Sequence, residues 1–521
     1  MINFINRNTT FNKALTALLL LAVLSANFSC KKALDVQSTR LSTEETQWTT
    51  LEDGLSGVLG MYALMRTAMA SNNTHWLMGE LRQGDFQATN RSDLKAIIRG
   101  DLKASYPIMN EISNWRRFYS VVNATSLFIE RSGEILAKDK RYTKVNNDVD
   151  IAQARALRAF AYFYMVRIWG DVPLLTSSHD GQFEEHERTD QKKVLAFAES
   201  ELLAAAKVLP IYYGWADPQL PGDYYGRNRD YWNGVLFTKI SAYAILSHIT
   251  AWQGKYLETE IYTKFIMDNY QKDGSQSSPR YISMNDLTEN GFYSPFAFKR
   301  GVQIVGFAFE YGNGEATANG HIEQLTLAAP ITRKPVPDMY VPKDTILAAF
   351  KDRKDLRFGL DTITKLFRTN YFVNFNTEKP IFKKIAVVQN GDIGNDGTYA
   401  VFSSAVLFTR LEELTLLRAE ALAALGFRNE AIDALNTASA KRGATAFSNT
   451  SSDDVVDAIF AERRRELMGE GWRWYDLVRY NRIKRNNPGF NKLLDENGIY
   501  WPISRDVLNA NKKIVQNSFW N

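Results

Sequence analysis

Residues 411–440 read LEELTLLRAEALAALGFRNEAIDALNTASA, and they decide the fold. In the first half, Leu411, Leu414 and Leu417 recur at three-residue steps, which places them on one face of an α-helix. The turn GFRN follows, and residues 430–440 continue as a second helix. Small alanines on both helices allow close antiparallel packing. The segment therefore predicts a helix–turn–helix pair of the tetratricopeptide kind.

An earlier segment repeats the end of the first helix of this pair. The sequence AILSHITAWQGKY at 244–256 has a small residue, then Gly254, then Tyr256. Tetratricopeptide units in a regular array follow one another about every 34 residues, and these two segments lie much further apart. We therefore expect a helical-repeat scaffold whose repeats are separated by insertions.

Amphipathic patterns predict further helices at 52–66, 115–136, 154–169, 190–208 and 235–252. The clearest is 154–169, in which Leu157, Phe160 and Tyr164 form one apolar stripe. Gly170 and Pro173 follow and end this helix. The predicted fold class is mostly α.

Helical periodicity fades in a middle region, where glycine, asparagine and aromatic residues become frequent. Within it, the alternating run IFKKIAVVQ at 381–389 predicts short strands. A long irregular stretch inside a compact chain is usually functional. We expect one domain over 30–521, with a helical scaffold at about 40–256 and 405–481, an irregular insertion at about 257–404 and a C-terminal extended segment at 482–521.

The N-terminal region combines a basic start with a short apolar run that ends at Cys30, the only cysteine of the 521 residues. The run from Ala14 to Leu24 would reach only about 16 Å as a helix, too short for a hydrocarbon core of about 30 Å. These features predict a lipoprotein signal peptide over residues 1–29 and lipidation of Cys30. The alternative is an incidental cysteine within a discarded signal.

Composition excludes several classes of function. The formal net charge is +5 and the charges are evenly spread, so we expect no nucleic acid partner. The five histidines show neither an HExxH pair nor close metal-ligand spacing; they are His75, His179, His186, His248 and His321. The sequence also has no GxSxG and no P-loop motif. We expect no metal, no cofactor and no enzymatic activity.

A glycoside hydrolase remains an alternative, because the two carboxylates that such enzymes need meet only in space.

Two motifs near the C-terminus indicate packing. ERRREL at 462–467 mixes charges within one helical turn, which favours a salt-bridged packing helix over a ligand contact. In the following turn, Trp472, Trp474 and Tyr475 are expected to dock on the core.

Binding is better supported than catalysis, because loops 72–85, 212–234 and 309–321 are rich in aromatic and amide or carboxylate side chains. A sugar site needs aromatic rings for the C–H faces and polar groups for the hydroxyls. The candidate ligand-binding residues are Trp76, Asp85, Trp215, Tyr224, Tyr225, Trp232, Tyr311 and Asn313. A packing role is the alternative for each aromatic, and Trp232 also fits the start of a following helix.

Four segments of the chain form an ordered set of motifs: ARALRAFAYFYMVRIWGDVPLL (154–175), RLEELTLLRAEALAALG (410–426), AIFAERRRELMGEGWRWYDLVRYN (458–481) and YWPISRDVLNANKKIVQNSFWN (500–521). In these motifs the chain resembles the SusD/RagB family of Bacteroidetes outer-membrane lipoproteins. The resemblance implies a tetratricopeptide scaffold with a variable ligand-binding face. The candidate ligand residues lie outside these motifs and are not taken from the family.

The resemblance also implies a cell-surface lipoprotein, held on the outer membrane by a lipid on Cys30. Such a protein captures nutrients, usually glycans, and delivers them to a SusC-like TonB-dependent transporter. Capture of peptide, as in RagB-like binders, is the alternative, and a purely structural lid over the transporter is a third.

Overall fold

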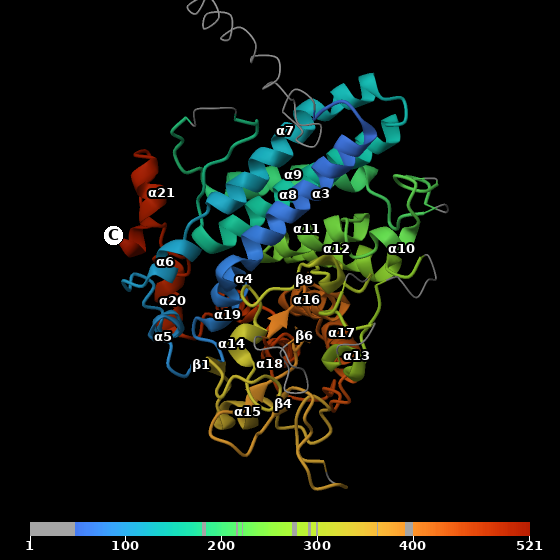
Figure 1. Ribbon diagram of the computed structural model, residues 1–521. Helices are drawn as coiled ribbons and strands as arrows, with labels where there is room; N and C mark the ends of the chain where they lie inside the picture. Colours follow the sequence, from blue (N-terminus) through green and yellow to red (C-terminus); the bar gives the residue numbers. More distant parts are fainter. Residues whose placement is uncertain are drawn as a thin grey trace, which may run out of the picture.

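A computed structural model describes residues 47–179, 184–214, 217–220, 222–272, 279–289, 293–298, 301–361, 363–390 and 400–521 (Figure 1). Its scaffold consists of long helices: α3 (Leu51–Ala70), α7 (Arg116–Lys138), α8 (Lys144–Trp169), α9 (Gln191–Val208), α11 (Lys239–Gln253), α12 (Tyr256–Asn269), α16 (Leu411–Ala424), α17 (Arg428–Ala440), α18 (Val455–Glu466) and α19 (Arg473–Lys484). The helices predicted from periodicity are all present, and the mostly α fold class is confirmed.

Successive helices of the scaffold pack side by side in the order α7, α8, α9, α11, α12, α16 and α17. The turns after α11 and α16 pass through Gly254 (φ +75°) and Gly426 (φ +88°), whose left-handed backbone suits glycine. Because α12 packs directly on α16, the two predicted repeat pairs are neighbours in space. The insertion therefore leaves the helical stack at α12 and returns to it at α16.

The insertion is built from short elements, coloured from yellow-green to orange in Figure 1. Its elements are α13 (Met284–Thr288), β2 (Val305–Phe307), η3 (Tyr311–Asn313), α14 (Glu323–Thr326), β3 (Met339–Tyr340), α15 (Lys343–Ala349), β4 (Phe372–Val373), β5 (Ile381–Phe382), β6 (Val388–Asn390), β7 (Val401–Phe402) and β8 (Val406–Thr409). The strands pair antiparallel as β2–β8, β4–β5 and β6–β7, and β3 pairs with β1 (Gln87–Ala88). The predicted short strands are confirmed, but the insertion begins after α12 rather than at residue 257.

The C-terminal region is not extended, which corrects the prediction for 482–521. It forms α20 (Pro488–Asp495), α21 (Arg505–Ala510) and η4 (Ser518–Trp520). Side chains of Asn487 and Ser504 cap the two helices by accepting backbone N–H groups, so short polar sequences suffice to start them. The remaining short elements are η1 (Ser71–Asn73), α4 (Thr74–Trp76), η2 (Leu77–Leu81), α5 (Ser92–Arg99), α6 (Pro107–Ile112) and α10 (Arg229–Trp232).

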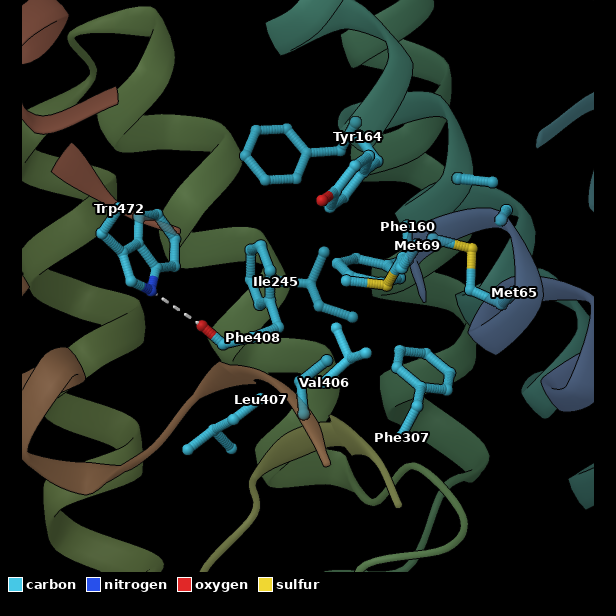
Figure 2. Close-up of a cluster of buried hydrophobic side chains, with 14 of the residues drawn as sticks. Met65, Met69, Phe160, Tyr164, Ile245, Phe307, Val406, Leu407, Phe408 and Trp472 are labelled. Carbon is cyan, nitrogen blue, oxygen red and sulfur yellow. Dashed lines mark hydrogen bonds between the residues drawn. The ribbon is translucent and has the colours of Figure 1, made fainter. Parts of the chain in front are cut away.

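One apolar core joins the scaffold to the insertion (Figure 2). Strand β8 is buried at every position and brings Phe408 against Phe160 of α8, with ring centroids 4.9 Å apart. Trp472 closes the cluster and donates its indole N–H to the carbonyl oxygen of Phe408 at 3.1 Å. This fixes the base of the insertion to the repeat helices.

A network of buried charges lies beside this core. Glu466 of α18 accepts from Arg442 at 2.7 Å and from Arg357 at 3.1 Å, and it forms an ion pair with Arg410 at 2.8 Å. These four side chains are at most 1% exposed. Arg463 likewise pairs with Glu413 at 2.8 Å. The packing role predicted for ERRREL is confirmed, and the network ties the insertion to α16–α18.

Within the described part of the chain, none of the helices combines the length and apolarity needed to cross a bilayer.

Candidate ligand-binding face

The segment 72–85 was expected to be an exposed loop, and the structure corrects this. It folds into the short helices α4 and η2, and Trp76 is only 2% exposed. A Cβ added to Gly79 would lie 1.9 Å from the carbonyl oxygen of Gly471, so the two backbones are in direct contact. The apolar residues between the polar ones drive this burial, and Trp76 is a packing residue.

Asp85, the polar candidate of the same segment, is also committed to packing. It is 5% exposed and accepts from the Arg464 guanidinium, with Nε and Oδ2 2.9 Å apart. A carboxylate engaged by a partly buried arginine is not available to a ligand hydroxyl. This corrects the prediction for Asp85.

Two aromatic candidates of the 212–234 loop are buried as well. Trp232 is 0% exposed, ends α10 and donates its indole N–H to the carbonyl oxygen of Tyr224 at 3.0 Å. Tyr224 is 2% exposed, and its ring contacts that of Trp232. Neither can act as an exposed stacking platform, because each is used to pack the loop on itself.

The loop is anchored on Asp150, a buried residue of α8 that the sequence did not reveal. Its carboxylate accepts hydrogen bonds from the hydroxyl groups of Tyr142 and Tyr225 at 2.6 Å and from that of Tyr224. Burial raises the pKa of Asp150 to about 7, although the three hydroxyl groups oppose this rise. We call Asp150, Tyr142, Tyr224 and Tyr225 the tyrosine centre.

The loop at 309–319 does present its candidates to solvent. Tyr311 in η3 is 48% exposed, and Asn313 is exposed as well. The base of the loop is held by Arg66 of α3, which donates to the carbonyl oxygen of Ala308 and to Glu315, both at 2.7 Å. Tyr311 is therefore displayed on a supported loop of the insertion.

Two aromatic side chains of the 212–234 loop are also partly exposed. Tyr225 is half-buried, and its hydroxyl group is held by Asp150. Tyr231, which the sequence reasoning did not single out, is 38% exposed, and the Arg227 guanidinium lies 5.2 Å from its ring centroid. Aromatic residues occur both in cores and on binding surfaces, so composition alone did not separate Tyr231 from Trp232.

Helix α3 connects the two loops. A Cβ on Gly54 would lie 3.0 Å from the Tyr225 hydroxyl oxygen, and Arg66 holds the 309–319 loop. These positions are about 18 Å apart along the helix axis. The structure thus brings two of the three predicted loops to one helix and folds the third into the core. Trp215 and Cys30 lie outside the described residues, and both remain predictions.

The described histidines of the core serve packing. His75 contacts the Tyr164 hydroxyl group at 2.8 Å and the carbonyl oxygen of Glu470 at 3.0 Å, and burial lowers its pKa to about 3. His248 lies 3.0 Å from Glu413. Among the described residues, no group of three or more His, Cys, Asp or Glu side chains is arranged to hold a metal ion.

These features define a helical-repeat protein whose insertion carries exposed polar and aromatic loops. Comparison with known proteins gives its family: the chain belongs to the SusD family. The family model described as "SusD family" matches residues 373–520. A SusD superfamily protein of Bacteroides thetaiotaomicron, known from a crystal structure, is 46% identical with a TM-score of 0.82, over 91% of this chain and 99% of the other.

Two further relatives agree over most of their length. A SusD-like protein of Formosa agariphila is 25% identical over 554 residues, which cover 97% of this chain and 98% of the relative. A SusD homolog of Bacteroides thetaiotaomicron is 23% identical with a TM-score of 0.73, over 91% of this chain and 99% of that one, which is a likeness of fold. The resemblance noted in the sequence is confirmed.

Proposed function

We propose that this protein captures oligosaccharides at the cell surface and delivers them to a SusC-like TonB-dependent outer-membrane transporter. Membership in the SusD family supports the proposal. The observation that carries it is the exposed loop at 309–319, where Tyr311 and Asn313 stand on a base held by Arg66.

The chemistry of this loop suits a sugar. The Tyr311 ring offers a flat face for the C–H groups of a pyranose, and the Asn313 amide both donates to and accepts from hydroxyl groups. An open surface leaves much of the ligand solvated, so affinity for one short oligosaccharide should be low and should grow with chain length. Salt should change it little, because the contacts are mostly neutral.

The same proposal places the protein on the outer membrane through a lipid on Cys30. Replacing Cys30 by Ala should release the protein from the membrane fraction of cells that lack the transporter. A variant that stays fully in the outer membrane of such cells would contradict the lipid tether.

Titration calorimetry against a panel of polysaccharides and peptides tests the ligand class. Tyr311→Ala should weaken glycan binding about fivefold to tenfold without lowering the melting temperature. Tyr106→Ala is the matched control, because Tyr106 is 37% exposed and precedes α6, outside the three loops. An equal loss in both variants would contradict a site at Tyr311.

The alternatives predict different results in the same experiment. Tight, salt-sensitive binding of peptides with no binding of any glycan would favour capture of peptides, as in RagB-like binders. Release of reducing sugar from a polysaccharide would favour a glycoside hydrolase.

A further inference from the structure

A second candidate site lies far from loop 309–319 in the sequence, among the repeat helices. A cleft of about 780 Å³ opens between the start of α9, the turn joining α11 to α12, and the end of α19. Its size is within the range of about 300–1,000 Å³ that is usual for small-molecule sites. Residues that line it include Gln191, Lys192, Trp252, Lys255, Arg482 and Tyr500. We call it the α9–α19 cleft.

The charges of the cleft have one sign. Lys192, Lys255 and Arg482 line it, and among the described residues no carboxylate does. Lys255 is partly compensated by Glu199 at 3.0 Å, whereas no salt bridge within the described chain involves Lys192 or Arg482. By contrast, the hollow beside α15 and α18 is lined by aspartate and glutamate as well as by cations.

The cationic group of Arg482 is partly buried against an aromatic ring. Its guanidinium lies 4.4 Å from the Trp252 ring centroid and donates to the carbonyl oxygen of Trp252. Burial lowers the pKa of Arg482, as expected for a charge that lacks a carboxylate partner. An anion in the cleft would supply that partner.

Aromatic and amide groups surround these cations. Tyr256 and Tyr500 line the cleft, and the Tyr500 hydroxyl group donates to the Gln191 amide oxygen at 2.6 Å. The Trp252 indole N–H and the Gln253 amide oxygen are buried and have no hydrogen-bond partner among the described residues. Buried groups of this kind are costly unless a ligand or water satisfies them.

A smaller hollow of about 110 Å³ continues the cleft through the shared residues Gln191, Asn497 and Tyr500. It contains Asp171 and Arg188. Asp171 accepts the backbone N–H of Gln191 at 2.9 Å, and Arg188 donates to the carbonyl oxygen of Asp171 at 2.8 Å. These two charges are engaged within the protein and leave the cationic character of the main cleft intact.

We propose that the α9–α19 cleft binds a carboxylate-bearing saccharide, such as a uronic acid residue within an oligosaccharide. The cations would hold the carboxylate, the amides would meet the hydroxyl groups, and the aromatic rings would contact the sugar faces. This site shares no residue with the 309–319 loop, so the proposal does not rest on capture of glycans at Tyr311.

Calorimetry with trigalacturonate and with a glucuronate-containing hyaluronan fragment tests the proposal. At least one should bind, more weakly as salt is raised. For trigalacturonate, its methyl ester is the neutral control and should bind at least tenfold more weakly.

Lys192→Gln should weaken uronate binding about threefold to tenfold. The matched control is Lys193→Gln, at an exposed neighbouring position that does not line the cleft, and it should bind as the parent does.

The outcomes separate the alternatives. Absence of binding by both uronates, or equal binding of the methyl ester, would overturn the proposal. Equal binding of triglutamate would assign the cleft to acidic peptides instead, and equal effects of the two lysine variants would place the anion elsewhere. Tyr311→Ala should leave uronate binding in the cleft unchanged, which separates this proposal from the function proposed for the loop.

Discussion

Glu466 and Asp150 are both fully buried carboxylates, but their surroundings differ. Arg357, Arg410 and Arg442 surround Glu466. Among the described residues, the carboxylate of Asp150 accepts hydrogen bonds only from the hydroxyl groups of the tyrosine centre. Burial alone would raise the pKa of Glu466, yet Arg442 and Arg410 hold it well below its ordinary value. Burial raises the pKa of Asp150 to about 7.

The difference separates two ways of fixing a loop. At Glu466, full charges joined by strong hydrogen bonds tie the insertion to α16–α18. At Asp150, neutral donors hold Tyr224 and Tyr225 of the 212–234 loop, and they do not fully offset the burial of a carboxylate. The first arrangement is rigid and expensive to break, and the second responds to pH near neutrality.

The largest effect is expected from Glu466→Gln. An uncharged amide would remove one buried carboxylate from each of three buried arginines, which keep their other carboxylate partners. Breaking a buried ion pair typically costs about 3–5 kcal/mol. We expect a loss of at least this size in the free energy of unfolding, measured by urea denaturation, or failure to fold. The effect should be far larger than that of any surface pair.

Glu315→Gln is the matched control for this prediction. Glu315 pairs with Arg66 at 2.7 Å, but the two side chains are 30% and 24% exposed. Exposed pairs contribute about 0–1 kcal/mol. Similar losses of unfolding free energy in the two variants would mean that burial does not determine how much the Glu466 network contributes to stability.

The contrast also explains what could be predicted from the sequence. The helices at 154–169 and 411–440 were predictable because the spacing of apolar residues along a helix is local and periodic. The packing role of 462–467 was predictable because charges of both signs share one helical turn. The partners of Asp150 were not, since Tyr224 and Tyr225 lie more than 70 residues away in the sequence.

The candidate site was only partly predictable for a related reason. Trp76 and Tyr311 stand in segments of similar composition, yet one is 2% and the other 48% exposed. Which segment is buried depends on long-range contacts, such as that between Gly79 and Gly471. The α9–α19 cleft is assembled from distant parts of the chain and left no local pattern.

The second prediction concerns pH and Asp150. Its folded pKa of about 7 exceeds the unfolded value of 3.8, so the folded state holds a proton that the unfolded state releases. This contribution to stability is fully present below the unfolded pKa and is lost as pH rises through 7. It amounts to up to about 4 kcal/mol. Asp150→Asn should therefore be less sensitive to pH than the parent between pH 4 and 7, as measured by urea denaturation.

Other buried carboxyl groups titrate in the same window. Burial also raises the pKa of Glu80 and of Glu323 to about 7. The test therefore compares the free energy of unfolding of the parent with that of the variant at each pH. An unchanged pH dependence in Asp150→Asn would contradict a protonated Asp150 in the folded protein.

The smallest effect on stability is expected from Tyr224→Phe. This change removes one of the hydroxyl groups that donate to Asp150 and keeps the buried ring. Asp150 retains the hydroxyl groups of Tyr142 and Tyr225, so the loss should be about 1–2 kcal/mol, the usual contribution of a hydrogen bond to a charged or buried group. Because fewer donors then stabilise the ionised form, the pKa of Asp150 should rise further and the loss should be larger at pH 8 than at pH 5. Denaturation at both values measures this, with Tyr106→Phe at an exposed position as the control. A loss that does not depend on pH would mean that the Tyr224 hydroxyl group does not stabilise the ionised carboxylate of Asp150.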